Sequence, residues 1–253
     1  MKKIKFASQK YNSDEIILIY TPGKVGSSSL EKSLKDSIHT HTLYCNPPNP
    51  PHWKLDYYSR IDKFKFHFKQ FVRRLLIRRA KKITIITVVR EPISRNISMF
   101  FQALPFWLAY SSSNMSHDRM SPREEGFNYI VDAYQKNFNH RYITSWFDKE
   151  ILRFSGINIY EHDPITKGLW DVTRGKYRLI VSTLENLSDN VSFIENALGQ
   201  KIDLDVQNSG SRKWYSDIYK SFKSYDLQDS EINQLLKESK YYKKFYLNED
   251  FEK

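Results

Sequence analysis

The strongest constraint on the fold is a short stretch in which an apolar run passes through small residues into a helical pattern. Residues 16–20, Ile-Ile-Leu-Ile-Tyr, are apolar and mostly β-branched, which is typical of a buried strand. Pro22, Gly23 and Gly26 then turn the chain into three serines. From Leu30 the apolar residues recur at helical spacing. The stretch therefore predicts a strand, a small-residue loop and the start of a helix.

This geometry suits the binding of a phosphate or sulfate. Exposed backbone N–H groups and the helix dipole point at the anion, and glycine lets the backbone approach it closely. Lys24 adds a positive charge, and the hydroxyls of Ser27 to Ser29 add donors. The loop is not a Walker A motif, G-x-x-x-x-G-K-[ST], because its lysine lies between the two glycines. An ordinary strand–helix connection capped by serines is the alternative.

The order Pro-Gly-Lys-Val-Gly-Ser-Ser-Ser resembles the 5′-phosphosulfate loop of sulfotransferases that use 3′-phosphoadenosine-5′-phosphosulfate (PAPS). The resemblance implies a three-layer α/β fold with a mostly parallel sheet, like that of P-loop kinases, and a reaction that requires no metal. It implies that Lys24 meets the oxygen bridging sulfur and phosphorus. The residues it assigns to the donor are Pro22, Gly23, Lys24, Val25, Gly26, Ser27, Ser28 and Ser29.

Length and composition predict one folded domain over residues 1–253. The chain has 253 residues, of which 40% are hydrophobic, enough to form the core of one α/β domain. A single cysteine, Cys45, excludes an intramolecular disulfide and favours a reducing compartment. The basic N-terminus lacks the apolar core of a signal peptide, and no apolar run reaches the roughly 20 residues of a membrane span. We therefore expect a cytoplasmic protein.

Most of the net charge of +11 lies in residues 60–82, where ten basic residues accompany one acidic residue, Asp62. Apolar residues at helical spacing predict an amphipathic helix here, with a basic outer face. That face could be merely solvated, hold a polyanionic acceptor or contact an anionic membrane. We expect no nucleic-acid partner, because no zinc-finger, RNP or helix-turn-helix pattern accompanies the charge. The apolar residues are Phe64, Phe68, Phe71, Val72, Leu75 and Leu76.

Residues 83–89 form the clearest predicted strand, which ends at Arg90-Glu91-Pro92. Arginine at this point stands at the edge where doubly wound sheets bind ligands, and proline suits the first turn of the next helix. The spacing from Arg90 to Ser98 resembles the 3′-phosphate site of sulfotransferases, which implies that the two residues clamp that phosphate. Alternatively, Arg90 pairs with Glu91 and Ser98 lies on the helix surface.

A hydroxyl acceptor needs a general base, and residues 38–43 supply the candidates. Their alternation predicts a short strand with His39 and His41 on one face. His41 is the first candidate because it lies at the carboxyl end of that strand. His39 is the second and Glu31 the third, whereas both histidines could instead be core residues. No further ligands join them, so no metal site is expected.

The second half of the chain contains the predicted acceptor side. Residues 105–170 read as an insertion, residues 170–175 as a turn and residues 177–181 as a strand. The Lys-Trp-Tyr-Ser sequence that begins at Lys213 resembles the signature of a capsular-polysaccharide-synthesis family allied to sulfotransferases. That resemblance implies a carbohydrate acceptor, such as a bacterial surface polysaccharide or its lipid-linked precursor. It makes Arg212 and Lys213 candidates for closing over the 3′-phosphate; alternatively they begin a helix whose Trp214 and Tyr215 enter the core.

These observations predict a PAPS-dependent sulfotransferase that transfers a sulfuryl group to a hydroxyl or amine of a carbohydrate. Two other functions stay open at this point. One is an ATP-dependent kinase on a related P-loop fold, which would need Mg²⁺. The other is a non-catalytic basic module that binds membrane or nucleic acid through residues 60–82.

Overall fold

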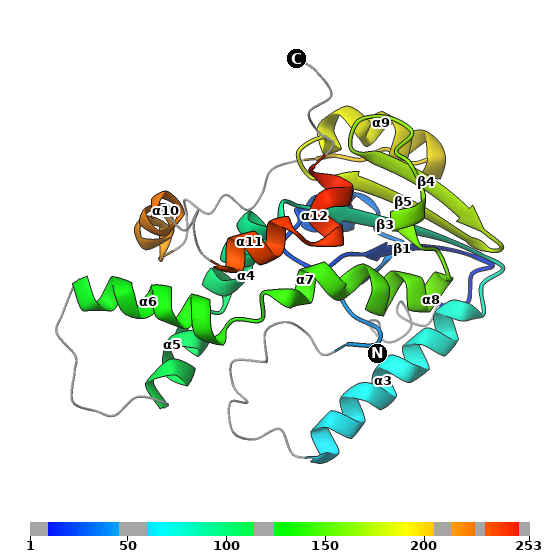
Figure 1. The fold of residues 1–253 in the computed structure, drawn as a ribbon. Helices are drawn as coiled ribbons and strands as arrows, with labels where there is room; N and C mark the ends of the chain where they lie inside the picture. Colours follow the sequence, from blue (N-terminus) through cyan, green and yellow to red (C-terminus); the bar gives the residue numbers. More distant parts are fainter. Residues whose placement is uncertain (1–9, 46–59, 114–123, 205–213, 226–230, 248–253) are drawn as a thin grey trace.

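A five-stranded sheet forms the centre of the protein (Figure 1). The structure is a computed structural model that describes residues 10–45, 60–113, 124–204, 214–225 and 231–247. The sheet order is β2-β1-β3-β5-β4, and only β4 runs antiparallel to its neighbour. The prediction of an α/β chain with a mostly parallel sheet is thus confirmed. The strands are β1 (Glu15–Tyr20), β2 (Ile38–Thr40), β3 (Lys82–Val89), β4 (Leu169–Arg174) and β5 (Tyr177–Thr183).

Helices pack on both faces of the sheet, as the alternation of buried residues along the strands requires. On one face, Ile19, Ile86 and Ile180 contact the helices α2 (Ser27–Ser33) and α9 (Leu187–Leu198). On the other face, Leu18, Ile85 and Leu179 share a core with helices from the second half of the chain. These are α7 (Arg141–Trp146), the π-helical segment η1 (Phe147–Leu152), α8 (Arg153–Ser155), α11 (Glu231–Lys237) and α12 (Lys240–Phe245).

The turn predicted for residues 170–175 is wrong, because most of that stretch lies in the antiparallel edge strand β4. Trp170 and Val172 are buried on one side of β4, and Gly175 forms the turn into β5 with a φ of 56°. On the other side, Asp171 accepts two hydrogen bonds from Arg178 of β5, at 2.7 and 2.9 Å. The period-two pattern of Trp170 and Val172 was the signal for a strand.

The predicted strand over residues 38–43 ends early, at Thr40. Beyond that point the backbone N–H groups of Leu43 and Cys45 donate to the buried carboxylate of Glu150, at 2.8 and 2.7 Å. These groups therefore do not form strand hydrogen bonds, and the chain leaves the sheet. Side chains cover the open edge of β2 instead, because the Lys10 ammonium donates to the Ser37 carbonyl and Arg73 donates to the His39 carbonyl, at 3.0 and 2.6 Å.

A separate aromatic core joins four helices beside the sheet (Figure 1). They are α4 (Pro92–Gln102), α5 (Leu104–Ser113), α6 (Glu124–Asn137) and α10 (Ser216–Ser224). The predicted insertion, residues 105–170, thus contributes to both cores. Helices α5 and α6 build the aromatic core, whereas α7 to α8 and the 3-10 turn η2 (Ile159–Glu161) belong to the core against the sheet. Tyr215 is buried in the aromatic core, but Trp214 is 72% exposed.

The helix predicted in the basic region is α3 (Arg60–Arg78), and Lys82 already belongs to β3. The basic residues Lys65, Lys69 and Arg79 are exposed as expected, but the apolar side of the helix is not buried. Phe64, Phe68 and Phe71 are 70%, 57% and 48% exposed, so the apolar residues face outward. The segment extends away from the sheet in Figure 1.

We expect the stability of the protein to fall in acid because of His140. This buried side chain donates from Nε2 to the Tyr134 carbonyl at 2.7 Å, while its Nδ1 has no partner among the described residues. Burial lowers the pKa of His140 from its usual 6.5 to about 4. The unfolded chain therefore binds the proton first, so this contribution is complete above about pH 6.5 and is lost, by about 3 kcal/mol, as the pH falls towards 4.

Urea unfolding measured across this pH range tests the expectation. His140→Gln keeps a donor for the Tyr134 carbonyl but does not titrate, so its free energy of unfolding should fall less steeply with acid. An identical slope in wild type and variant would show that His140 does not cause the loss.

Candidate functional site

The sheet order places the predicted loop and Arg90 at the same edge of the sheet, at the carboxyl ends of two neighbouring strands. The chain leaves β1 for β2 on one side, whereas β3 lies on the other side of β1. The order of strands thus reverses at the carboxyl ends of β1 and β3, where open α/β sheets bind ligands. Residues 21–26 follow β1 and Arg90 follows β3, so the candidate anion site lies at this switch point.

The loop backbone adopts unusual dihedral angles. Gly23, Lys24 and Gly26 have φ values of 79°, 63° and 76°, and Lys24 is the one non-glycine residue with positive φ among the described residues. A left-handed conformation costs a non-glycine residue about 1 to 2 kcal/mol. The N-cap of α2 is Gly26, and no side chain caps the helix. The serine-capped connection considered as the alternative is therefore not what forms.

Arginines hold three successive carbonyls of the loop. Arg95, which is fully buried, donates to the Pro22 and Gly23 carbonyls at 2.6 and 3.1 Å, and Arg90 donates to the Lys24 carbonyl at 3.3 Å. Because a trans peptide carries its C=O and N–H on opposite sides, the N–H groups that follow these carbonyls point away from the arginines. Those of Gly23 and Val25 have no hydrogen-bond partner in the part of the chain that the structure describes. The loop thus offers backbone donors to a ligand.

Arg95 is a site residue that the sequence analysis missed. Its guanidinium lies 5.1 Å from the centre of the Tyr142 ring and donates to the Asn96 side chain at 3.0 Å. Burial lowers the pKa of Arg95 to about 10, so it stays charged at neutral pH. Loop carbonyls and an aromatic ring compensate a buried positive charge here. The one signal in the sequence was an arginine on the inward face of the helix after Arg90.

No hydrogen bond joins Arg90 and Ser98 in the described structure, and their shared phosphate clamp, which needs none, stays a prediction. Ser98 lies on α4 about two turns beyond its start, half-buried, and no described residue bonds to its hydroxyl. Arg90 does not pair with Glu91 either, because Glu91 caps α4 by accepting from the Ile93 and Ser94 N–H groups at 3.0 and 2.6 Å. The Tyr241 hydroxyl accepts from the Arg90 N–H and donates to the Arg90 carbonyl, at 3.2 and 2.9 Å, and so fixes the Arg90 backbone.

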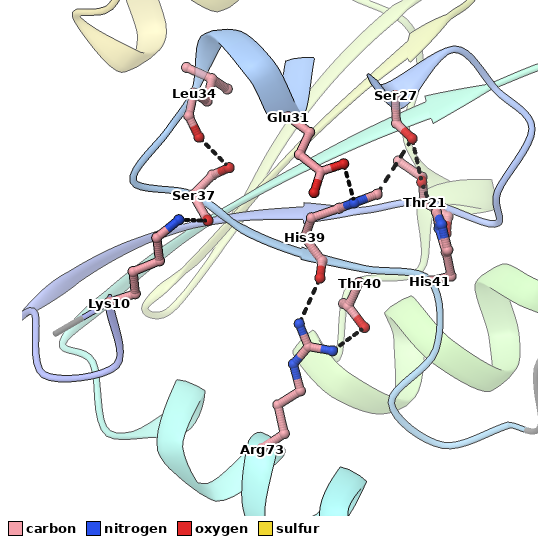
Figure 2. A network of polar contacts seen from close by, with 10 residues as sticks. All are labelled: Lys10, Thr21, Ser27, Glu31, Leu34, Ser37, His39, Thr40, His41 and Arg73. Atoms are coloured by element: carbon pink, nitrogen blue, oxygen red, sulfur yellow. Dashed lines mark hydrogen bonds and ion pairs between the residues drawn. The ribbon is translucent and has the colours of Figure 1, made fainter. Parts of the chain in front are cut away.

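The three candidate bases gather beside the loop, as Figure 2 shows. His39 lies between Glu31 and the loop: its Nδ1 is 2.9 Å from the Glu31 carboxylate and its Nε2 is 3.5 Å from the Ser27 hydroxyl. The carboxylate only accepts, so Nδ1 carries the proton. Burial lowers the pKa of His39, although the Glu31 carboxylate opposes the shift.

His41 lies next to the loop with one ring nitrogen engaged. Its Nδ1 donates to the Thr21 carbonyl at 3.0 Å, so Nε2 carries the lone pair, and Nε2 has no partner among the described residues. The Trp146 indole donates to the His41 carbonyl at 3.0 Å and fixes the backbone. Part of the residue is exposed, but burial of the ring and the nearby His39 ring lower the pKa of His41 to about 4.

A pocket of about 420 Å³ opens beside His39, between the edge of β2, α2 and α3. Its lining carries Lys10, Lys32, Lys35 and Arg73 against the single carboxylate of Glu31. Arg73 reaches the pocket from α3 and also donates to the Thr40 hydroxyl at 3.0 Å (Figure 2). The pocket is therefore predominantly positive and adjoins the candidate base.

Two of the predicted site residues are not placed by the structure. Arg212 and Lys213 lie outside the described residues. No cluster of three or more histidine, cysteine or acidic side chains with metal-binding geometry occurs within the described ranges.

Comparison of the chain with protein-family models, with curated proteins and with solved structures found no match.

Proposed function

We propose that this chain is a PAPS-dependent sulfotransferase that acts on a hydroxyl or amine of a carbohydrate. The observation that carries the proposal is the loop after β1 at the switch point, whose carbonyls bind Arg90 and Arg95 while the N–H groups of Gly23 and Val25 have no partner among the described residues. Lys24 adds a positive charge to this loop. The resemblance of the loop to the 5′-phosphosulfate loop supports this choice of anion, and with it a sulfotransferase-type P-loop fold.

The residues present fit the charge distribution of PAPS. The N–H groups of Gly23 and Val25, which have no partner within the described ranges, suit a 5′-phosphate, and the Lys24 charge would stabilise the leaving oxygen. Arg90 lies beside the loop, where its guanidinium would meet the 3′-phosphate. When bound, PAPS supplies the sulfuryl group, and the protein mainly positions reactants and stabilises charge.

His41 is the proposed general base. Its Nδ1–H bond to the Thr21 carbonyl holds the neutral tautomer and leaves the lone pair on Nε2 for the proton of the acceptor hydroxyl. The pKa of about 4 would make it a weak base, but an anion bound at the adjacent loop favours its protonated form and raises that pKa. His39, held by Glu31 and facing Ser27, is the second candidate.

The kinase alternative is less well supported because the sequence has no GK[ST] at the start of α2. The basic pocket beside His39 supports an acceptor that is itself anionic, such as an acidic sugar. A carbohydrate acceptor in general rests on the resemblance of the sequence that begins at Lys213.

Calorimetric binding of 3′,5′-adenosine bisphosphate, the product of the donor, tests the proposal. We expect the wild type to bind it in metal-free buffer and to bind ATP far more weakly. Lys24→Ala and Arg90→Ala should each weaken binding roughly ten- to a hundredfold, because each removes a charged donor.

Lys136→Ala is the matched control, since this exposed lysine pairs with Asp132 on the surface of α6. Thermal unfolding of each variant shows whether the fold persists. Absence of bisphosphate binding by folded wild-type protein would overturn the proposal, and Mg²⁺-dependent binding of ATP would favour the kinase.

A further inference from the structure

Helix α3 carries an exposed apolar stripe. Phe64, Phe68, Phe71, Val72 and Leu75 are between 37% and 70% exposed. At about 100° per residue they span roughly 100° of the helix circumference, and the stripe extends about 16 Å along it. The Phe64 and Phe68 rings stack with their centres 6.2 Å apart. Contiguous exposed apolar patches of this kind mark interaction surfaces.

The opposite side of α3 fastens the helix to the protein. Ile77 is fully buried, Arg73 donates to the His39 carbonyl, and Arg74 donates to the Leu43 carbonyl. By the same helical geometry Arg73 and Ile77 lie about half a turn from the stripe, whereas Arg74 lies beside it, with its guanidinium 5.7 Å from the centre of the Phe71 ring. The stripe therefore faces away from the body of the protein on a helix whose orientation is held.

Positive charge flanks the stripe. Lys65 and Lys69 lie along one side of it and Arg79 lies at its end, all exposed and without an ion-pair partner among the described residues. No aspartate or glutamate occurs between Phe64 and Lys82. An apolar stripe with a lysine border is the pattern of helices that lie in the interface of an anionic bilayer.

We propose that α3 docks this protein on an anionic membrane surface, with the stripe among the acyl chains and the lysines at the headgroups. A second copy of the chain fits less well, since a two-fold interface would bring the same cations together with no acidic residue to oppose them. No described helix is long and apolar enough to cross a bilayer. Arg73, on the other side of α3, donates to the His39 carbonyl and lines the basic pocket. Docking through α3 would therefore bring that pocket close to the bilayer.

Sedimentation of the full chain with lipid vesicles tests this inference. We expect binding to vesicles of phosphatidylglycerol and phosphatidylcholine, little binding to phosphatidylcholine alone, and weaker binding at high salt. Replacing Phe64, Phe68 and Phe71 together by serine should lower the affinity more than a hundredfold. Lys65→Gln with Lys69→Gln should lower it roughly thirtyfold on anionic vesicles.

Ile165→Ser with Trp214→Ser is the matched control, because both residues are exposed and lie outside α3. This control should bind vesicles like the wild type, and the phenylalanine variant should keep its melting temperature and its binding of adenosine bisphosphate. The proposal therefore stands or falls independently of the proposed function. Failure of the wild type to bind anionic vesicles would overturn it, as would equal loss in the control. Sedimentation velocity without lipid completes the test, because a dimer that the phenylalanine changes dissociate would assign the stripe to a second copy.

Discussion

Replacing Arg95 with leucine is expected to lower the free energy of unfolding by about 3 to 5 kcal/mol and to abolish binding of adenosine bisphosphate. The leucine leaves the buried carbonyls of Pro22 and Gly23 without their donor, and each unsatisfied group costs about 1 to 3 kcal/mol. The loop would then relax from its left-handed conformation at Lys24, and its N–H groups would no longer converge. Urea unfolding and calorimetry measure the two effects.

Two further variants sharpen this test. Arg141→Leu removes an exposed arginine at the start of α7 and should change stability by less than about 0.5 kcal/mol. Arg95→Lys keeps the positive charge but cannot reach both carbonyls, so it should restore part of the stability and little of the binding. If Arg95→Leu were as stable as the wild type and bound the bisphosphate normally, Arg95 would not organise the loop.

Glu150→Ala should also cost about 3 to 5 kcal/mol of stability. The fully buried Glu150 carboxylate accepts from the Tyr20 hydroxyl and from the N–H groups of Leu43, Tyr44 and Cys45. Alanine would leave these donors buried without an acceptor. The segment after β2 should loosen, so hydrogen exchange at the Leu43 and Cys45 amides should accelerate most.

Glu238→Ala is the control for this change, because Glu238 is exposed just after α11 and its side chain bonds only to Gln234 among the described residues. It should leave both stability and exchange unchanged. Glu150→Gln retains an acceptor oxygen but adds an N–H₂ group among donors, so its stability should fall between wild type and alanine. Unchanged exchange at Leu43 and Cys45 in Glu150→Ala would contradict the role assigned to Glu150.

The elements with the most regular local patterns were predicted well. The apolar run at 16–20, the run at 83–89 and the strand at 177–181 became the parallel strands β1, β3 and β5, because the pattern of a fully buried strand does not depend on its partners. Proline after Arg90 started α4 as expected. The errors came where local pattern and tertiary demand differed. Residues 170–175 pair with β5, and the segment after Thr40 bonds to Glu150.

In the candidate site, too, the sequence located the residues marked by local pattern and missed those defined by distant contacts. Sequence alone located the loop, Lys24, Arg90 and the two histidines, because each stands in or directly after a predicted strand. It could not locate Arg95 or Glu150, whose partners lie 72 and 107 residues away at Gly23 and Leu43.

By itself, then, the sequence determined an α/β chain with a loop of glycines and serines after its first strand, since strand pattern and glycine placement are local properties. The tertiary structure alone decided which buried charges hold that loop, where β2 ends and which side of α3 meets solvent. Periodicity shows that a helix has an apolar side, but only packing decides whether that side is covered. On α3 the body of the protein binds the side that carries Ile77 and Arg73, and the phenylalanines are left outside.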